Sequence, residues 1–443
     1  MTINKLSKKI LNVNKASIKN IEINNKQNAI IFEVEMHKSS KHRCPICGKR
    51  CSGYDTISVK RSWRAMDLGS YKTFIVSKVD RICCKAHGVV SEFVPWARHN
   101  SRFTHDFEDH LAYCSLHLNK KETSRLMRVA WNTVGEVLTR VRKDLERNLE
   151  DRFNGLEIIG IDETSYQKGH KYITTIVDQV RKRVVYIYEG KTRDGLDDFF
   201  KKLTESQRNS IKYVSGDGAK WISASVKDYL PNAEFCIDAF HVVQRAIEAM
   251  DEARKEIWRD LKNFKKERVE KYSRNKSRKT KRKLLEHETI KKTAKYALGK
   301  NPENLTSNQQ NFIDKQLKTY PKLYRCYLLK EELRLLLKMD DPVYVGSALK
   351  KRYFKASHSR LESIKKLGDK INKRYDQIIN TVKYKISNAL IESFNNTIKG
   401  LIKKSYGFRN LENMKDLIYI SCSDLSKRIV PAFEILYLTV LII

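Results

Sequence analysis

The chain has 443 residues, with 88 lysine and arginine residues against 52 aspartate and glutamate residues, and its formal net charge is +36 at pH 7. A hydrophobic content of 41% is ordinary for a globular protein and excludes wholesale disorder. So large a positive excess attracts polyanions, because contacts between Lys or Arg and phosphates release condensed counterions. We therefore expect nucleic acid as the partner. The alternative is a basic protein whose charge serves only solubility.

The two ends of the chain bear on its location. The N-terminus lacks the long apolar segment of a secretory signal, which predicts a cytoplasmic protein. The chain contains nine cysteines, and in a reducing cytoplasm close-spaced cysteines indicate metal ligands rather than disulfides. The apolar residues 433–443 are too few to span a bilayer, so we expect no membrane partner.

Two motifs near the N-terminus have the spacing of a zinc knuckle. In each motif two residues separate a pair of potential ligands, and the predicted ligands are Cys44, Cys47, Cys84 and His87. Two such pairs can hold one zinc ion in a closed, tetrahedral structural site. Cys51 or Cys83 could replace one of these ligands, and the alternative is a group of buried thiols without metal. The alternation of residues 29–35 predicts a strand of the surrounding β module.

The next segment predicts two short helices joined by a turn near residues 129–131. Asn119 is the expected N-cap of the first helix, with Glu122 three residues later. Thr133 repeats this device with Glu136 at the second helix. The arrangement fits a helix-turn-helix, whose second helix enters the major groove, although many helical hairpins share the pattern. The predicted DNA contacts are Asn132 and Thr133 at the leading end of the second helix, and Arg140 and Arg142 on its outward face.

The middle of the chain is organised around an apolar run that ends at Asp162. Residues 156–164 predict a buried strand. A strand buried on both faces does not comfortably carry a charge in its middle, but it can present one at its tip, where a site opens. We therefore expect Asp162 to lie in a site at the end of this strand.

The residues that follow predict a mixed, five-stranded sheet. Residues 172–177 and 184–188 are separated by a tight turn and predict an antiparallel meander with the first strand. The next expected elements are a crossover helix, a fourth strand ending at Asp217, another helix, and a fifth strand at 234–241 that runs into a helix. This is the ribonuclease-H-like order, in which the ends of the first and fourth strands lie side by side.

In such a sheet Asp162 and Asp217 would face one site. Two close carboxylates repel each other, so the pair is stable mainly when divalent cations neutralise it. Asp238, in the stretch of the fifth strand, could replace Asp217 as the second ligand. Asp238 and His241 could instead support the ligands, and a helix cap or core-edge role is the remaining alternative for Asp238.

Between the fifth strand and the last helix the sequence predicts a helical insertion with a small leucine-rich core. Its basic run, from Lys262 to Lys283, is typical of a solvated helix face or a mobile arm. In a nucleic-acid enzyme such a run could also follow phosphates.

The last helix, residues 388–399, has an apolar face that would pack on the sheet through residues such as Ile391 and Ile398. A neighbouring stripe contains Asn388, Glu392, Asn395 and Lys399. A single glutamate among amides and lysines is poor salt-bridge design, but it suits a metal ligand beside a DNA strand. The alternative is an amphipathic helix with an incidental glutamate.

In this order the segments resemble the bacterial insertion-sequence transposases of the ISL3 family, which have a DDE catalytic core. The residues on which this resemblance rests are the four expected zinc ligands, Gly160 to Glu163, Gly216 to Gly218, Asp238 to His241, Asn388 to Lys399, and Tyr406 to Asn410. The resemblance covers nearly the whole chain, and the ordered set is more specific than any one motif. His87 stands where the family usually has cysteine, and the apolar end after Val430 is a second departure.

The resemblance implies a transposase that binds the terminal inverted repeats of its element and catalyses metal-dependent DNA cleavage and strand transfer. Asp162, Asp217 and Glu392 would hold two Mg²⁺ ions, with Mn²⁺ as a substitute. The residues expected to support them are Asp238, His241, Asn388, Asn395 and Lys399. Also implied are a structural Zn²⁺, a homo-multimer on double-stranded DNA, and a bacterial, cytoplasmic protein at the nucleoid.

Two other readings remain open from the sequence. One is a zinc-containing DNA-binding regulator with an inactive nuclease-like core, and the other is a ribonuclease-H relative that cleaves without strand transfer. The expected fold is thus a multidomain α/β protein. Its parts are a zinc-binding domain at 1–100, a helix-turn-helix at 101–150, a ribonuclease-H-like core beginning at 151–260, a helical basic insertion at 261–375, and the last core helix with the tail at 376–443.

Overall fold

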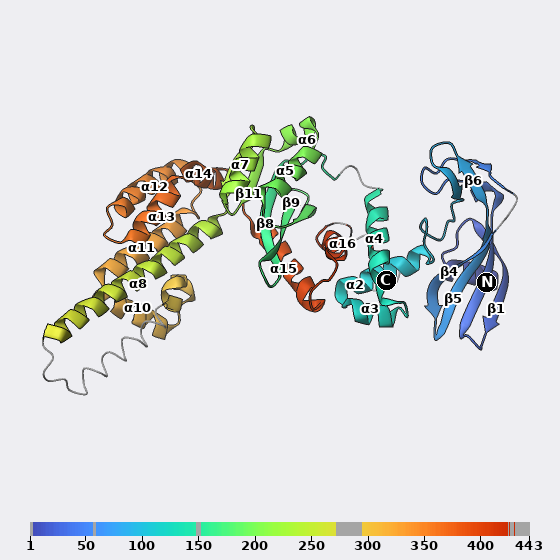
Figure 1. Ribbon diagram of the computed structural model, residues 1–443, viewed down its shortest axis with the longest axis horizontal. Helices are drawn as coiled ribbons and strands as arrows, with labels where there is room; N and C mark the ends of the chain where they lie inside the picture. The colour runs from blue at the N-terminus through green and yellow to red at the C-terminus, as the bar shows by residue number, and fades with distance from the viewer. Residues whose placement is uncertain are drawn as a thin grey trace, which may run out of the picture.

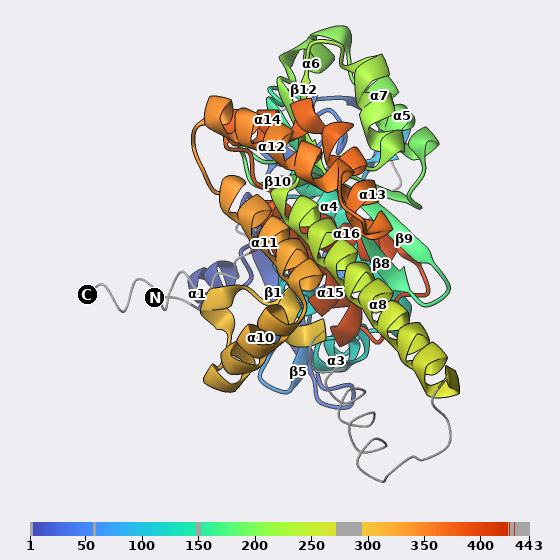
Figure 2. The same cartoon turned by 90° about the vertical axis from the view of Figure 1, so that its left-hand side faces the viewer.

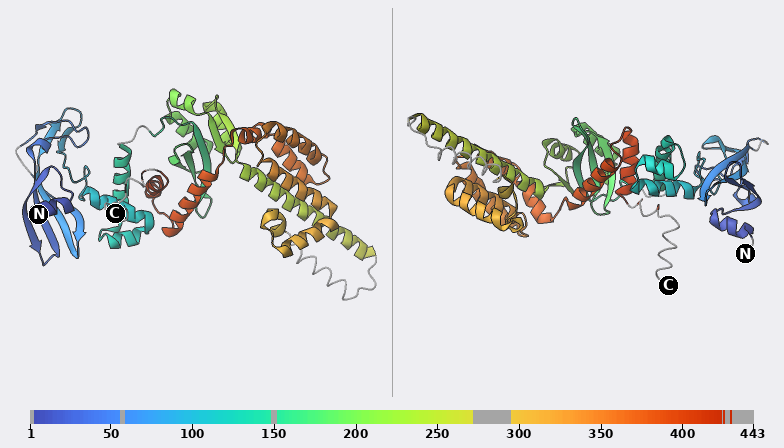
Figure 3. Two further views of the ribbon diagram at one scale, coloured as in Figure 1. Left: turned by 180° about the vertical axis from the view of Figure 1, so that it is seen from behind. Right: turned by 90° about the horizontal axis from the view of Figure 1, so that it is seen from below.

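The computed structural model describes residues 3–55, 59–147, 152–271 and 295–423, with Leu425 and Ile429. The described part is elongated, with a β-rich module at one end, a five-stranded sheet in the middle and a helical body at the other end (Figure 1). Figure 3 shows the same order from behind and from below. The basic run after Lys271 and the apolar residues 433–443 lie outside the described residues.

The N-terminal module contains α1 (Ile3–Ile10) and two sheets. The larger sheet has the order β1-β2-β5-β4, formed by β1 (Ala16–Asn24), β2 (Ala29–Met36), β4 (Val59–Leu68) and β5 (Tyr71–Val79). The smaller sheet, β3-β6-β7, consists of β3 (Ser52–Gly53), β6 (Arg81–Cys84) and β7 (Gly88–Ser91). Phe32 of β2 is buried against Trp63 and Ile75, so the strand expected at residues 29–35 is confirmed together with its inward face.

Three helices follow: α2 (His105–His117), α3 (Lys120–Leu126) and α4 (Trp131–Arg147). The Asn119 side chain accepts a hydrogen bond of 2.9 Å from the Glu122 backbone N–H, so the predicted cap of α3 is confirmed. The predicted cap at Thr133 is wrong. The backbone N–H of Thr133 already donates to the carbonyl of Ala130, because α4 begins two residues before Thr133.

The central sheet has the order β10-β9-β8-β11-β12, with β8 (Ile158–Gln167), β9 (Lys171–Asp178), β10 (Arg183–Glu189), β11 (Tyr213–Gly216) and β12 (Glu234–Ile237). The first three of these strands are antiparallel neighbours, whereas β11 runs parallel to both β8 and β12. The predicted mixed sheet of five strands, with its meander and its crossovers, is therefore confirmed.

The expectation that the first strand ends at Asp162 is wrong, because β8 continues to Gln167. The two edges of β8 differ, however. Parallel pairing with β11 stops at Gly160, opposite Ser215, whereas antiparallel pairing with β9 continues, with Asp162 opposite Thr175. Asp162 thus follows the last residue pair that β8 makes with β11, and it lies where the parallel half of the sheet ends.

Helices cover both faces of the central sheet. On one face, α5 (Arg193–Lys202), α6 (Glu205–Ser210) and α7 (Lys220–Tyr229) connect the strands, and Phe199 and Phe200 are fully buried there with Ile159 and Ile161. On the other face lie α15 (Ala389–Lys404) and α16 (Leu411–Ser421). Their apolar side chains form one cluster with residues of β9, β10, α2 and α4. The predicted apolar face of the last helix is confirmed by the burial of Ile391 and Ile398.

The helical body lies between β12 and α15. It is formed by α8 (Ala239–Lys271), α10 (Ser307–Thr319), α11 (Pro321–Leu336), α12 (Pro342–Ser357), α13 (Glu362–Asn372) and α14 (Tyr375–Tyr384). Helices α8 and α11 run side by side (Figure 2). Leu323, Leu333 and Leu336 are buried, so the predicted leucine-rich core of this body is confirmed. Helix α14 returns to the sheet by packing on β12.

The contact between α15 and β8 leads to a stability prediction. A Cβ atom at Gly160 would overlap Cδ1 of Ile391, so Gly160→Ala should destabilise the protein by about 1–3 kcal/mol through overpacking. Urea unfolding measures this change. Gly400→Ala is the matched control, because the space around Gly400 of α15 is open, and it should stabilise the protein by about 0.5–1 kcal/mol. Equal effects of the two substitutions would contradict the close packing.

Candidate active site and metal centre

Three aspartates lie at one edge of the central sheet. Asp162 is in β8 beyond its pairing with β11, Asp217 directly follows β11, and Asp238 directly follows β12. Each carboxylate is fixed by a local backbone bond. Asp162 accepts from the N–H of Glu163 at 2.9 Å, Asp217 from that of Ala219 at 2.7 Å, and Asp238 from that of Phe240 at 3.1 Å.

The charges of neighbouring acids raise the pKa values of several of these acids. Burial raises the pKa of Asp162, and the charge of Asp217 raises it further. Burial likewise raises the pKa of Asp238, to which the charges of Asp162 and Glu392 contribute. The pKa of Glu163 rises to about 7, first through burial and then through the charges of Asp217 and Asp162. Glu392, an exposed residue in the first turn of α15, therefore belongs to the same acidic group.

The acids do not form a preformed cage. Within the part of the chain that the structure describes, groups of three or more His, Cys, Asp or Glu ligand atoms lying within 4.8 Å of one another occur only elsewhere, at Cys44 and at His42. The charge of Asp217 acts on Asp162, and the charge of Glu392 acts on Asp238, but these acids are not closed around a single ion. Such an open arrangement suits Mg²⁺, which usually keeps waters and binds through one or two carboxylates together with substrate phosphates.

Asn395 connects α15 directly to the first aspartate. Its Nδ2 donates to Oδ2 of Asp162 at 2.6 Å, and its Oδ1 accepts from the Thr164 hydroxyl at 2.7 Å. Asn395 and Thr164 are both buried, so the bond between them is shielded from water, whereas the bond to Asp162 is partly buried. Sequence reasoning singled out Asn395 but missed Thr164, although Thr164 lies two residues from Asp162 and thus on the same side of the strand.

The other residues expected to support the metal ligands, His241, Asn388 and Lys399, lie at different distances from the acids. Nε2 of His241 lies 3.8 Å from Oδ2 of Asp238. Asn388 is buried and lines a cavity together with Asp238 and Glu392. Lys399 is exposed, further along α15.

Two arginines that sequence reasoning missed hold the loop after β11. Nη2 of Arg245 donates to the backbone carbonyl of Asp217 at 2.9 Å, and Arg374 donates to the carbonyl of Gly218. Both side chains come from the helical body, far along the chain from β11, so no local pattern could indicate the contacts.

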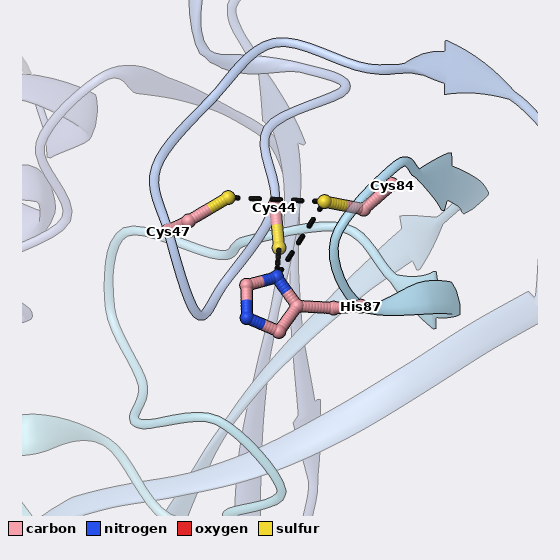
Figure 4. A group of neighbouring side chains, drawn as sticks. All are labelled: Cys44, Cys47, Cys84 and His87. Carbon is pink, nitrogen blue, oxygen red and sulfur yellow. Dashed lines mark hydrogen bonds between the residues drawn. The ribbon is translucent and has the colours of Figure 1, made fainter.

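The four expected zinc ligands converge between two loops of the N-terminal module (Figure 4). Sγ of Cys47 lies 3.8 Å from Sγ of Cys84, and Nδ1 of His87 lies 3.6 Å from Sγ of Cys44 and 3.5 Å from Sγ of Cys84. Ligands on a tetrahedral zinc would be about 3.8 Å apart for two sulfurs and about 3.6 Å apart for sulfur and nitrogen, given the usual bond lengths. The cluster of three cysteines and one histidine is therefore compatible with zinc.

A buried carboxylate joins the two loops that carry these ligands. Oε2 of Glu92 accepts from the His42 backbone N–H at 2.7 Å, and its Oε1 accepts from the Asp80 N–H at 2.9 Å. His42 and Asp80 precede the first and second ligand pairs, so Glu92 fixes the distance between the pairs.

The predicted DNA contacts of α4 divide into two groups. Asn132 is exposed and Thr133 half-buried at the start of the helix. The expectation that Arg140 and Arg142 lie on the outward face is wrong. Nε of Arg140 donates to the buried Glu108 at 2.7 Å, and Arg142 donates to Asp416, whose side chain is 1% exposed, and at 2.9 Å to Glu146. These arginines neutralise buried acids, which periodicity along one helix could not reveal.

Among the described residues, no helix is both long and apolar enough to cross a membrane.

Comparison with known proteins agrees with this arrangement. The transposase model of the ISL3 DDE type matches residues 159–418, and the helix-turn-helix domain of transposase family ISL3 matches residues 92–142. The transposase for insertion sequence element IS1557 of Mycobacterium tuberculosis is 36% identical over 385 residues, which cover 86% of each chain. The transposase for insertion sequence element IS1001 of Bordetella parapertussis is 25% identical over 376 residues, covering 83% of this chain and 86% of the relative.

The fold and the matched regions define an α/β transposase with a helix-turn-helix DNA-binding domain. The chain belongs to the ISL3 family of insertion-sequence transposases. The reading as a DNA-binding regulator with an inactive core is not favoured, because the regions matched and the relatives are those of transposases.

The zinc-compatible cluster leads to a prediction about metal content. The purified protein should contain about one zinc ion per chain, and Cys84→Ser should weaken zinc binding by more than about a hundredfold because a ligand is lost. Metal analysis after dialysis against a chelator measures both. Cys83→Ser is the matched control, since the neighbouring Cys83 is exposed and outside the cluster. Loss of zinc in Cys83→Ser with retention in Cys84→Ser would reverse the ligand assignment.

The raised pKa of Glu163 leads to a pH prediction for the metal-free protein. The folded-state pKa of about 7 exceeds the ordinary glutamate pKa of 4.5, so the ionised side chain destabilises the fold, and stability is lost as the pH rises between these values. Glu163→Gln removes this cost. Its gain in the urea unfolding midpoint should grow from about pH 5 to about pH 7 and then level off. Added Mg²⁺ should reduce the gain, and a gain independent of pH would contradict the assignment.

Proposed function

We propose that this transposase cleaves and joins DNA at the ends of its own mobile element by metal-dependent phosphoryl transfer. The observation that carries the proposal is the bond from Asn395 to Asp162, which brings the start of α15 to the sheet edge where the three aspartates lie. Glu392 is three residues before Asn395 and so lies on the same side of the helix. The strand order and directions of the central sheet support a ribonuclease-H-like core.

Carboxylate oxygens are the hard ligands that Mg²⁺ or Mn²⁺ prefers. We assign Asp162, Asp217 and Glu392 as ligands of two such ions, which would activate the attacking water or 3′-hydroxyl and stabilise the leaving oxygen. Asp238 is the competing second ligand, because its pKa responds to both Asp162 and Glu392.

The remaining residues position these ligands. Asn395 keeps Oδ2 of Asp162 in a fixed direction, while the Glu163 N–H binds Oδ1, so the carboxylate cannot rotate freely. Arg245 and Arg374 hold the backbone at Asp217 and Gly218 and bring positive charge to the acidic edge. In this assignment His241 supports Asp238, and Lys399 faces DNA beyond the acids.

We further propose the division of labour along the chain. The zinc-binding domain (1–100) and the helix-turn-helix (101–150) bind the terminal inverted repeats, with Asn132 and Thr133 entering the major groove. The core (151–260 and 376–443) carries the chemistry, and the basic insertion (261–375) contacts DNA phosphates. The zinc has a structural role, because its four ligands leave no open position. A homo-multimer on DNA at the nucleoid follows from the need to join two element ends.

The assignment of the second ligand can be tested directly. On a duplex that carries the DNA flanking the coding region, Asp217→Ala should lower the rate of Mg²⁺-dependent cleavage by at least about a hundredfold, because a group stabilising the transition state is lost. Asp198→Ala is the control, since its side chain is 65% exposed on α5. Full activity of Asp217→Ala together with an inactive Asp238→Ala would move the ligand to Asp238.

The DNA contact of α4 gives a binding prediction. Asn132→Ala should cost about 1–3 kcal/mol in discrimination between the terminal repeat and a scrambled duplex, because a base contact is lost. Lys143→Ala is the matched control, since it is exposed on the same helix, and it should affect both duplexes equally. Fluorescence anisotropy at fixed salt measures both variants. Unchanged discrimination in Asn132→Ala would exclude this contact.

A further inference from the structure

A cavity of about 620 Å³ lies between the helix-turn-helix and the last two helices of the core. One wall is formed by the turn between α2 and α3 and the start of α4, and the other by the turn between α15 and α16 (residues 405–410). Helices α4 and α16 pack together beside it (Figure 1), and a Cβ atom at Gly135 of α4 would overlap the side-chain amide of Asn413. The cavity thus joins the two parts of the chain where they are in close contact.

The charged side chains around this cavity are all basic. Among the described residues that line it, Lys120 and Lys121 of α3 and Arg409 of the α15–α16 turn carry charge, and none is a carboxylate. Nζ of Lys120 lies over the ring of Trp131, 3.5 Å from its centre. Lys121 and Arg409 are exposed, and neither side chain has an ion-pair or hydrogen-bond partner among the described residues. Free cations around a cavity without acids favour an anionic occupant.

The α15–α16 turn is strained where it borders the cavity. The Gly407 N–H donates to the carbonyl of Ile402 at 3.0 Å, so the turn caps α15. Such caps usually have glycine at the first left-handed position, but here Tyr406 occupies it with a φ of 54°. Its side chain is 92% exposed, so burial does not offset the strain. Strain that the fold does not need is typical of binding sites.

A line of lysines leads from this turn to the acidic edge. Lys399 and Lys403 are exposed and follow Glu392 by seven and eleven residues, so all three lie on one side of α15. Lysines often occupy the end of a helix because they complement its dipole, and Lys404 has a structural role, since its Nζ donates to backbone carbonyls of α2. That explanation does not extend to Lys121 and Arg409, which belong to other segments and converge on the same cavity.

The length of this line sets a distance along DNA. At about 1.5 Å per residue, Lys403 lies about 16 Å from Glu392 along the helix axis. A DNA strand advances about 3.4 Å per nucleotide, so this distance corresponds to about five nucleotides. The cavity lies just beyond Lys403.

We propose that this cavity binds the sugar–phosphate backbone of the element end, about five to seven nucleotides from the cleaved phosphate. Lys121 and Arg409 bind phosphates from its two walls, and Lys399 and Lys403 follow the same strand towards the acids. The inference rests on the proposed function, since the strand is the substrate of the acidic edge. Holding the strand at this distance determines which phosphate reaches the acids.

Binding of duplexes with one neutral linkage tests the proposal. A methylphosphonate replaces one phosphate at a time along the element end, and fluorescence anisotropy with the full-length protein measures Kd, with Ca²⁺ in place of Mg²⁺. For the wild type, a neutral linkage about five to seven nucleotides inside the element end should weaken binding about five- to tenfold, because a contact between a cation and a phosphate is lost. Lys121→Ala and Arg409→Ala should each weaken binding of the unmodified duplex by a similar factor and remove the penalty at one of these linkages.

Lys201→Ala is the matched control, because it removes the same charge from a side chain that is 61% exposed on α5, across the sheet from α15 and α16. It should leave both the Kd and the profile of penalties at the wild-type values. The proposal is overturned by a uniform wild-type profile, by a strongest penalty outside this interval, or by a penalty that both variants retain.

The binding readout separates this proposal from the proposed function, since it does not depend on cleavage. Mg²⁺-dependent cleavage by a protein with a uniform penalty profile overturns the phosphate-binding cavity alone. A penalty in this interval that the variants remove, without Mg²⁺-dependent cleavage of the same duplex, supports the cavity and overturns the proposed chemistry.

Discussion

The site depends on the docking of α15 against β8. The Ile391 side chain lies against Gly160, where a larger residue could not fit, and one turn later Asn395 bonds Asp162 and Thr164. The packing sets how close the helix comes, and the buried hydrogen bonds set its rotation. Together they fix where Glu392 stands relative to the sheet edge, although more than two hundred residues separate it from Asp162.

The same packing joins the DNA-binding helices to the core. Apolar residues of α2 and α4 belong to one buried cluster with β9, β10, α15 and α16. Arg142 adds an ion pair with Asp416 of α16, and the Thr139 hydroxyl donates to the same carboxylate. The distance from the helix-turn-helix to the acids is therefore set by a packed interface, so a repeat bound by α4 would lie at a fixed offset from the site of chemistry.

Much of this arrangement could be predicted from the sequence, because it follows from the local periodicity of apolar residues. Alternation and apolar runs predicted the central sheet, and a helical stripe predicted both the buried face of α15 and the position of Glu392 on it. The paired spacing of Cys44 and Cys47 with Cys84 and His87 predicted the ligand cluster. Each of these features involves residues close together in sequence or a motif with fixed chemistry.

The errors arose where partners distant in the sequence decide the outcome. Periodicity placed Arg140 and Arg142 on an outer face, but buried Glu108 and Asp416 hold them inside. The continuation of β8 beyond Asp162 depends on pairing with β9 after β11 has stopped. The contacts of Arg245 and Arg374 with the loop after β11 come from helices that the sequence alone could not orient.

The central claim is that an acid of β8, the acid that directly follows β11 and an acid of α15 bind metal together. Replacing Mg²⁺ with Fe²⁺ and generating hydroxyl radicals cuts the polypeptide near the bound ion, and mass spectrometry locates the cuts. The account predicts cuts near Asp162, Asp217 and Glu392 that disappear together in Asp162→Ala. Cuts near the two aspartates without any near Glu392 would contradict it.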